Sequence, residues 1–158
     1  AFNGKLNNSL HAAQLVKFFT LQDRNNGDYI WFGLPIYDSR SDFPPEHKAV
    51  DAGKSDATSK YIYAVDGKRL WRSKIRFGRW EKFNMDVLPL MKEALEDAFK
   101  KGWLKNSDLE DIVISTMNTG WEMPGPFNAI AEYKKITAQK YFYIMLHSPQ
   151  CGTCIGAN

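Results

Sequence analysis

Alternating apolar and polar residues predict two β-strands near the start of the chain. Residues 11–22 place apolar side chains on one side and polar ones on the other, with Lys17 as an exception on the apolar side. Apolar residues also interrupt the polar side, so both faces are expected to be partly buried. A polar, glycine-bearing turn leads to residues 29–37, which form a second strand and complete a hairpin. Gly33 and Pro35 predict a bulge or a sheet edge in this strand, because proline cannot donate a ladder hydrogen bond.

The middle of the chain predicts shorter strands around a long loop. Residues 38–60 show no periodicity and include two prolines and many charges, which indicates an extended loop. Residues 60–65 return to strand composition, and the Asp-Gly pair at 66–67 predicts a tight hairpin turn into residues 68–71. A further strand is expected from Ile75 through Phe77 to Trp80 and Phe83, interrupted by Gly78.

One segment has the period of an amphipathic helix. Asp86 is placed to cap its start, Pro89 fits the first turn, and Gly102 is placed to end it. The apolar stripe of this helix is expected to pack against a sheet. The residues that recur at spacings of three and four are Leu88, Met91, Leu95, Ala98 and Phe99.

The last third of the chain predicts three more strands. Residues 112–116 form a β-branched run, and a connection rich in glycine and proline separates it from strands at 127–133 and 138–146. Six or seven short strands with one inserted amphipathic helix favour an all-β fold, an antiparallel β-sandwich of jelly-roll type, over an α/β fold.

Composition and charge fit a single domain. With 158 residues and 44% apolar content, the chain can bury a core without a metal or a disulfide. The whole of 1–158 is expected to be one domain, with 1–10 as a loose leader and 147–158 as a C-terminal tail. The net charge of +3 is too small to indicate nucleic acid as a partner, although residues 68–82 are basic and aromatic. No apolar run approaches the roughly 20 residues of a membrane span.

Two clusters combine aromatic side chains with amide or carboxylate groups. The first contains Asn118, Trp121 and Glu122, and the second contains Trp31, Tyr37 and Asp38. Saccharides present flat C–H faces and many hydroxyls, so aromatic platforms beside bidentate polar groups are typical of their sites. The ends of strands can bring the two clusters together. The alternative is that Trp31 and Trp121 belong to the core and that Glu122 is a solvated turn residue.

The remaining tryptophans, Trp71, Trp80 and Trp103, are assigned to packing.

The segments 30–38 and 118–125, together with the late amphipathic helix, resemble bacterial jelly-roll sandwiches of the concanavalin-like, carbohydrate-associated kind. The resemblance covers residues 11–146 and includes no catalytic signature. It implies an extracellular or periplasmic setting and a sugar site on a concave face or a loop rim.

An enzymatic reading needs two carboxylates facing each other across a groove at about 5 to 9 Å. The candidates are Glu122, Asp38, Asp42 and Glu81, and no motif fixes a pair among them. A Ser-His-Asp hydrolase is disfavoured because the sequence contains no Gly-x-Ser-x-Gly elbow.

The C-terminal Cys151 and Cys154 have the spacing of a C-x-x-C motif without a following helix. A local disulfide between them is the preferred reading. His147 would add a third potential zinc ligand, but a closed zinc site needs a fourth.

The sequence thus predicts a non-catalytic domain of a secreted or periplasmic bacterial protein that binds a poly- or oligosaccharide. The alternatives are a glycoside hydrolase or lyase-like enzyme with a carboxylate pair, and a structural or partner-binding domain of a larger assembly. No cofactor and no metal site are predicted, while a calcium requirement stays open.

Overall fold

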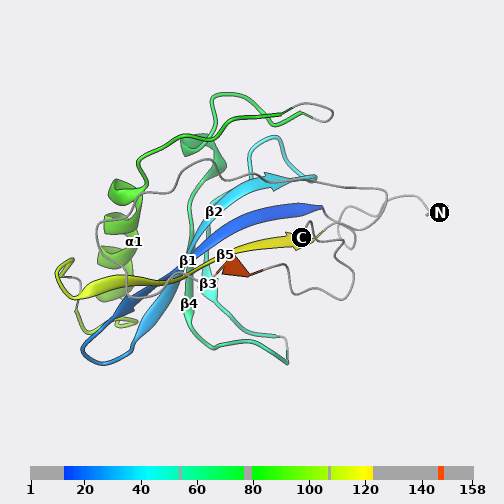
Figure 1. Ribbon diagram of the computed structural model, residues 1–158. Coiled ribbons are helices and arrows are strands. Elements are labelled where there is room, and N and C mark those ends of the chain that lie inside the picture. The colour runs from blue at the N-terminus through cyan, green and yellow to red at the C-terminus, as the bar shows by residue number, and fades with distance from the viewer. Residues whose placement is uncertain (1–12, 54, 77–79, 107, 123–145, 148–158) are drawn as a thin grey trace.

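The computed structural model describes residues 13–53, 55–76, 80–106, 108–122 and 146–147, and these form one six-stranded sheet with one α-helix on a face (Figure 1). The strand order is β3-β4-β2-β1-β5-β6. β1 pairs antiparallel with β2 and β5, and β3 pairs antiparallel with β4, whereas β2–β4 and β5–β6 are parallel. The elements are β1 (Gln14–Asp23), β2 (Tyr29–Asp38), β3 (His47–Val50), β4 (Tyr61–Ala64), the 3-10 turn η1 (Gly67–Arg69), α1 (Leu88–Lys100), β5 (Ile112–Glu122) and β6 (Leu146–His147).

The described part of the chain is therefore rich in strands, as predicted, but its single sheet is mixed and not purely antiparallel. The predicted hairpin is confirmed as β1 and β2. Pairing shifts between Leu15 and Val16, which leaves Ile36 as the extra residue of a bulge. The bulge was predicted, whereas the edge position was wrong because β2 lies inside the sheet. Pro35 is tolerated there since β4 pairs only with residues 31–33.

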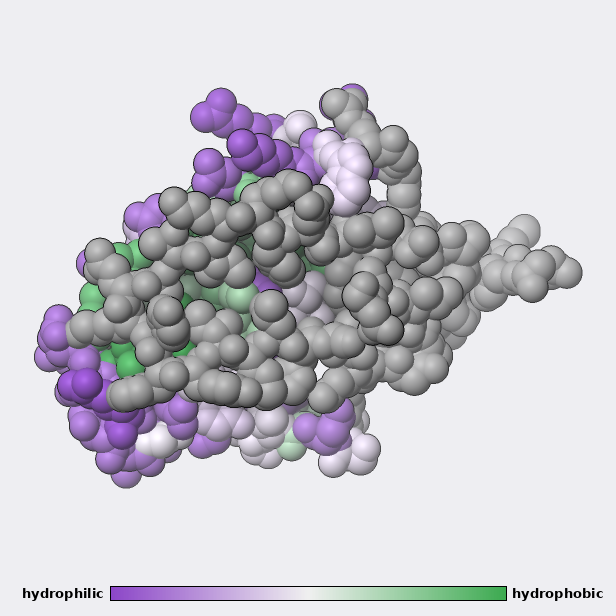
Figure 2. All heavy atoms as spheres, in the orientation of Figure 1, coloured by the Kyte–Doolittle hydropathy of each residue, from purple (hydrophilic) through white to green (hydrophobic). Residues whose placement is uncertain are grey.

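The core lies between the sheet and α1, on what we call the helix face of the sheet. From the strands it contains Phe19, Leu21, Ile30, Phe32 and Leu34, and from the helix Leu90, Met91, Ala94, Leu95 and Ala98. Figure 2 shows hydrophilic side chains along the upper and lower-left margins and apolar ones between them at the left, where Figure 1 places α1. Within the described residues, no helix is both long enough and apolar enough to cross a membrane.

The helix prediction is confirmed, with a correction to its stripe. The Asp86 carboxylate accepts a hydrogen bond of 3.0 Å from the Leu88 N–H, and Gly102 follows the helix with φ +76°. Leu88 and Phe99 were expected in the buried stripe but are 46% and 48% exposed. The stripe is centred on Met91 and Leu95, so these two residues fall at its flanks.

The opposite face of the sheet is aromatic. Trp31 makes edge contacts with both Phe18 and Tyr29, and its indole N–H donates to the Thr58 hydroxyl at 2.9 Å. The Phe18 ring covers Gly33, where a Cβ atom would lie only 2.9 Å from a ring carbon. Both faces of β1 are thus partly buried, as the mixed pattern of residues 11–22 predicted.

Tertiary pairing overrides the predicted turn at 66–67. Both sides of β4 are occupied, by β2 and β3, so residues 68–71 have no free edge to pair with. Instead, the Asp66 carboxylate accepts from the Lys68 N–H at 2.7 Å and starts η1. The loop predicted at 38–60 contains β3.

Three further predictions are corrected. Residues 117–122 belong to β5 and not to a connection, because β1 offers backbone partners along the whole length of β5. Trp80, assigned to packing, is 69% exposed. The strand predicted around Phe77 is wrong over its described part, since residues 75–76 and 80–83 are not in a strand. The strand predicted at 127–133 and residues 138–145 of the one predicted at 138–146 lie outside the described residues, as do Phe77 and the two cysteines.

Candidate functional site

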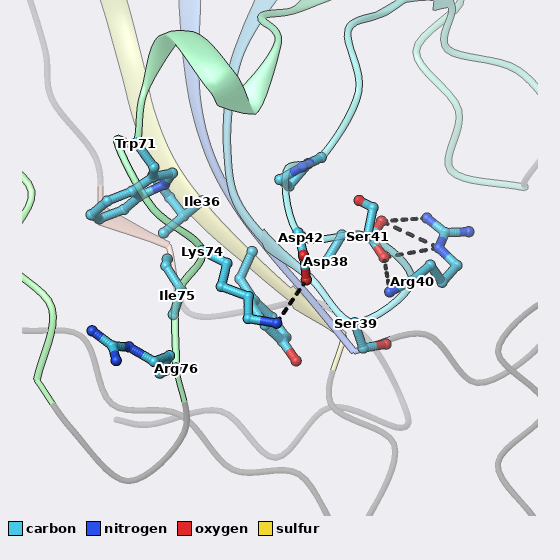
Figure 3. Close-up of a pocket in the computed structure, with 12 residues that line it drawn as sticks. Ile36, Asp38, Ser39, Arg40, Ser41, Asp42, Trp71, Lys74, Ile75 and Arg76 are labelled. Carbon is cyan, nitrogen blue, oxygen red and sulfur yellow. Dashed lines mark hydrogen bonds and ion pairs between the residues drawn. The ribbon is translucent and has the colours of Figure 1, made fainter.

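An open cleft of about 540 Å³ lies at the end of β2 (Figure 3). One of its sides is formed by the end of β2 and the loop after it, and the other by the segment that follows η1. The residues that line the cleft are Ile36, Tyr37, Asp38, Ser39, Arg40, Ser41, Asp42, Pro44, Trp71, Lys74, Ile75 and Arg76.

A close backbone contact brings the two sides together. The Gly67 N–H donates to the Pro44 carbonyl at 2.7 Å. A Cβ atom on Gly67 would lie 2.6 Å from Pro44 Cδ, so only glycine allows this approach without a shift. Four residues later, Trp71 packs against Phe83 with the ring centres 5.4 Å apart, which fixes the apolar end of the cleft against the core.

Asp38 is held as a carboxylate by its neighbours. Arg40 donates to it from Nη2 at 2.6 Å and Nε at 2.9 Å, and the Gln14 side chain donates at 2.8 Å. Burial alone would raise the pKa of Asp38, but the hydrogen bonds from Arg40 and Gln14 outweigh it and hold this pKa below its ordinary value. Burial and the charge of Asp38 raise the pKa of Tyr37, so Tyr37 is neutral at neutral pH.

The other polar groups of the cleft are more accessible. Lys74 approaches Asp42 at 3.3 Å, and both side chains are more than half exposed. Arg76 is exposed and makes no hydrogen bond or ion pair with any described residue. The indole N–H of Trp71 is buried and meets no acceptor among the described residues, which is uncommon for a donor inside a stable fold.

The sheet places the two predicted clusters only partly together. Leu15 of β1 pairs with Tyr37 on one side and Trp121 on the other, and the next pair of partners is Asp38 and Glu122. Since neighbouring strands are about 5 Å apart, the backbones of the two strand ends lie about 10 Å apart across β1.

Trp31 and Asn118 lie away from these strand ends. Both are on the face of the sheet away from α1, because Trp31 contacts Phe18 and Asn118 pairs with Phe18. Asp38 pairs with Gln14 and belongs to that same face, whereas Tyr37 pairs with Leu15 and falls on the helix face. Along β2, Trp31 is about 20 Å from Tyr37.

Sequence reasoning missed one side of the cleft. Trp71 had been assigned to packing alone, yet it also forms a cleft wall. Lys74 and Arg76 belong to the basic and aromatic stretch at 68–82, which does not by itself indicate nucleic acid. Its combination of basic and aromatic residues is the sequence feature that corresponds to this side of the cleft. Among the described residues, no group of three His, Cys, Asp or Glu side chains is placed to hold a metal ion.

Comparison with known proteins gives no relative: no family model matches the sequence, and no curated protein or solved structure is significantly similar to it. Functional inference therefore depends on the chemistry of the cleft.

Proposed function

We propose that this protein is a non-catalytic carbohydrate-binding domain and that a poly- or oligosaccharide lies in the cleft at the end of β2. The observation that carries this proposal is the composition of the cleft. An aromatic and aliphatic end, with Trp71 and Ile36, adjoins a polar end with Ser39, Ser41 and Asp42 (Figure 3).

This arrangement suits the two kinds of surface on a sugar ring. The C–H face of a pyranose is apolar and packs on an indole or on aliphatic side chains, while its hydroxyls need donors and acceptors at the rim. The cleft is open, so a chain longer than one sugar can lie across it.

Binding is favoured over hydrolysis by the state of the carboxylates. A glycosidase needs a protonated carboxyl group as general acid. Hydrogen bonds from Arg40 hold the pKa of Asp38 low and occupy its oxygens, which opposes that role. Asp42 is 67% exposed and paired with Lys74, and this is not the apolar setting that general acids use.

The predicted residues Trp121 and Glu122 extend the proposal across β1. Their backbones pair with Leu15 and Gln14, beside the strand end that opens into the cleft. A ligand of two or three sugar units is long enough to span the distance of about 10 Å between the two strand ends.

The predicted sandwich and its setting also stay proposals. The contacts among Phe18, Tyr29 and Trp31 support a second layer, because an aromatic sheet face is usually covered. A secreted or periplasmic location agrees with a polysaccharide ligand.

Affinity electrophoresis through gels containing single polysaccharides tests the proposal, and a glycan array supplies the candidates. Retardation by at least one polysaccharide is expected, and Trp71→Ala should abolish it. Trp80→Ala is the matched control, since Trp80 is exposed and does not line the cleft. Ser41→Tyr places bulk at an exposed cleft position without touching the core, so it should also abolish retardation. Release of soluble sugars would show an enzyme, and the absence of retardation by any polysaccharide would refute carbohydrate binding.

A further inference from the structure

The charged side chains that line the cleft differ in how firmly they are held by ion pairs. Three cationic residues and two carboxylates line it, so the cleft carries a net positive charge. Arg40 is committed to Asp38 through three side-chain hydrogen bonds of 2.6 to 3.2 Å. Arg40 therefore stabilises the folded protein, and it could bind a ligand only by breaking its hydrogen bonds to the buried carboxylate of Asp38.

Arg76 is in a different situation. Its side chain makes no hydrogen bond or ion pair with any described residue, although it lines the cleft. In Figure 3 its guanidinium group extends to the same side of the 71–76 segment as the Trp71 indole, away from the ion pair of Lys74 and Asp42. A guanidinium group presents a planar fork of donors that matches a carboxylate or a sulfate.

Lys74 adds a second, weaker attraction. Its partner Asp42 is 3.3 Å away, and the side chains are 58% and 67% exposed. Such exposed pairs are held loosely, because water screens them and both side chains are free to move. An anion entering the cleft can share the Lys74 ammonium group without breaking any buried interaction.

We infer that the cleft selects an acidic saccharide, whose carboxylate or sulfate group pairs with the guanidinium group of Arg76 while a neighbouring ring packs against Trp71. This inference rests on the proposed function and narrows its ligand class. A neutral glycan uses the hydroxyls and the aromatic wall but leaves the net positive charge of the cleft unpaired, so it binds more weakly.

The test compares polygalacturonate, which carries carboxylates, with dextran sulfate and with neutral dextran and xylan, by affinity electrophoresis and calorimetry. Retention of an acidic polymer should exceed that of neutral ones by about tenfold or more, the usual effect of one charge-assisted hydrogen bond. Raising the salt from about 50 to about 500 mM should remove most of this preference by screening. The polymer bound more tightly identifies carboxylate or sulfate as the preferred group.

Arg76→Gln should reduce binding of the acidic polymer about tenfold and leave binding of neutral polymers unchanged. Arg72→Gln is the matched control: Arg72 is exposed on the same segment but does not line the cleft, so its replacement should have little effect. Equal losses in the two variants would indicate general attraction to a basic surface and would overturn the inference.

Failure of the inference differs from failure of the proposed function. Neutral polymers bound as tightly as acidic ones, with sensitivity to Trp71→Ala, would leave a carbohydrate-binding cleft without charge selectivity. No binding of any polymer by the unmodified protein would overturn both.

Discussion

Lys17 is the most unusual residue of the core, and it leads to a quantitative prediction about stability. It lies on the helix face beside Phe19 and Leu21, and only 7% of it is exposed. Its ammonium group donates to the Thr119 hydroxyl at 3.1 Å. Burial lowers the pKa of Lys17 from 10.5 to about 8, because the charged form loses its hydration.

The lowered pKa is a cost to stability that depends on pH. Between about pH 8 and 10.5 the unfolded chain binds a proton at this site that the folded protein does not, so the free energy of unfolding rises with pH in this window. Below pH 8 the cost is present in full. The difference between 10.5 and about 8 corresponds to about 3 kcal/mol.

Lys17→Met removes the charge and keeps an unbranched side chain of similar length. The variant loses the hydrogen bond to Thr119, worth about 1 kcal/mol, so it should be more stable than the unmodified protein by about 2 kcal/mol near pH 7. This advantage should vanish or reverse slightly above pH 10.5, where Lys17 is neutral in both states.

Urea denaturation of both proteins from about pH 6 to pH 11 measures the effect. The difference between the two proteins is the useful quantity, because the titration of tyrosines and other lysines cancels in it. Lys92→Met serves as the control, since Lys92 is exposed on α1 and should show no such pH dependence. A stability difference that stays constant from about pH 7 to 11, or a Lys17→Met variant that is less stable at about pH 7, would show that burying the Lys17 charge carries no such cost.

Three other outcomes are expected. Leu95→Ala should lower the free energy of unfolding by about 2 to 4 kcal/mol, because Leu95 is 2% exposed in the core between α1 and the sheet; a loss under about 0.5 kcal/mol would contradict that packing. Gly67→Ala should cost at least about 2 kcal/mol and weaken ligand retention, whereas Gly120→Ala, which meets no described atom closer than 3.9 Å, should cost under about 1 kcal/mol. Titration of the denatured, unreduced protein should find no free thiol, and two reactive thiols with bound zinc would favour a metal site at the C-terminus.

Local sequence patterns were sufficient for the elements that depend on local interactions. The β1–β2 hairpin follows from two alternating segments and a short polar turn. α1 follows from its period, from Asp86, which accepts a hydrogen bond at its start, and from the glycine that follows it. Neither prediction needed knowledge of distant residues. The buried stripe of α1 was wrong at both ends, because the direction from which the sheet approaches is a tertiary property.

Elements that depend on distant partners could not be predicted in this way. β5 continues to Glu122 because β1 pairs with it throughout, although glycine and asparagine in residues 118–120 indicate a turn when read alone. The parallel pairing of β2 with β4 likewise leaves no trace in the period of either strand. The alternation within a strand shows which of its faces is buried, but not the direction of the neighbouring strand. The parallel pairs of this mixed sheet therefore could not be recognised in the sequence.

The cleft also depends on residues that are distant in the sequence, so its position could not be predicted from local patterns. Its two sides come from residues 36–44 and 71–76, and what joins them is the hydrogen bond from Gly67 to Pro44. The Asp-Gly pair at 66–67 was correctly seen as a place where the chain turns, but the glycine is needed there for a close approach to another loop and not for a positive φ angle. Because this approach positions Trp71 opposite the end of β2, one glycine couples the packing of two loops to the shape of the proposed binding site.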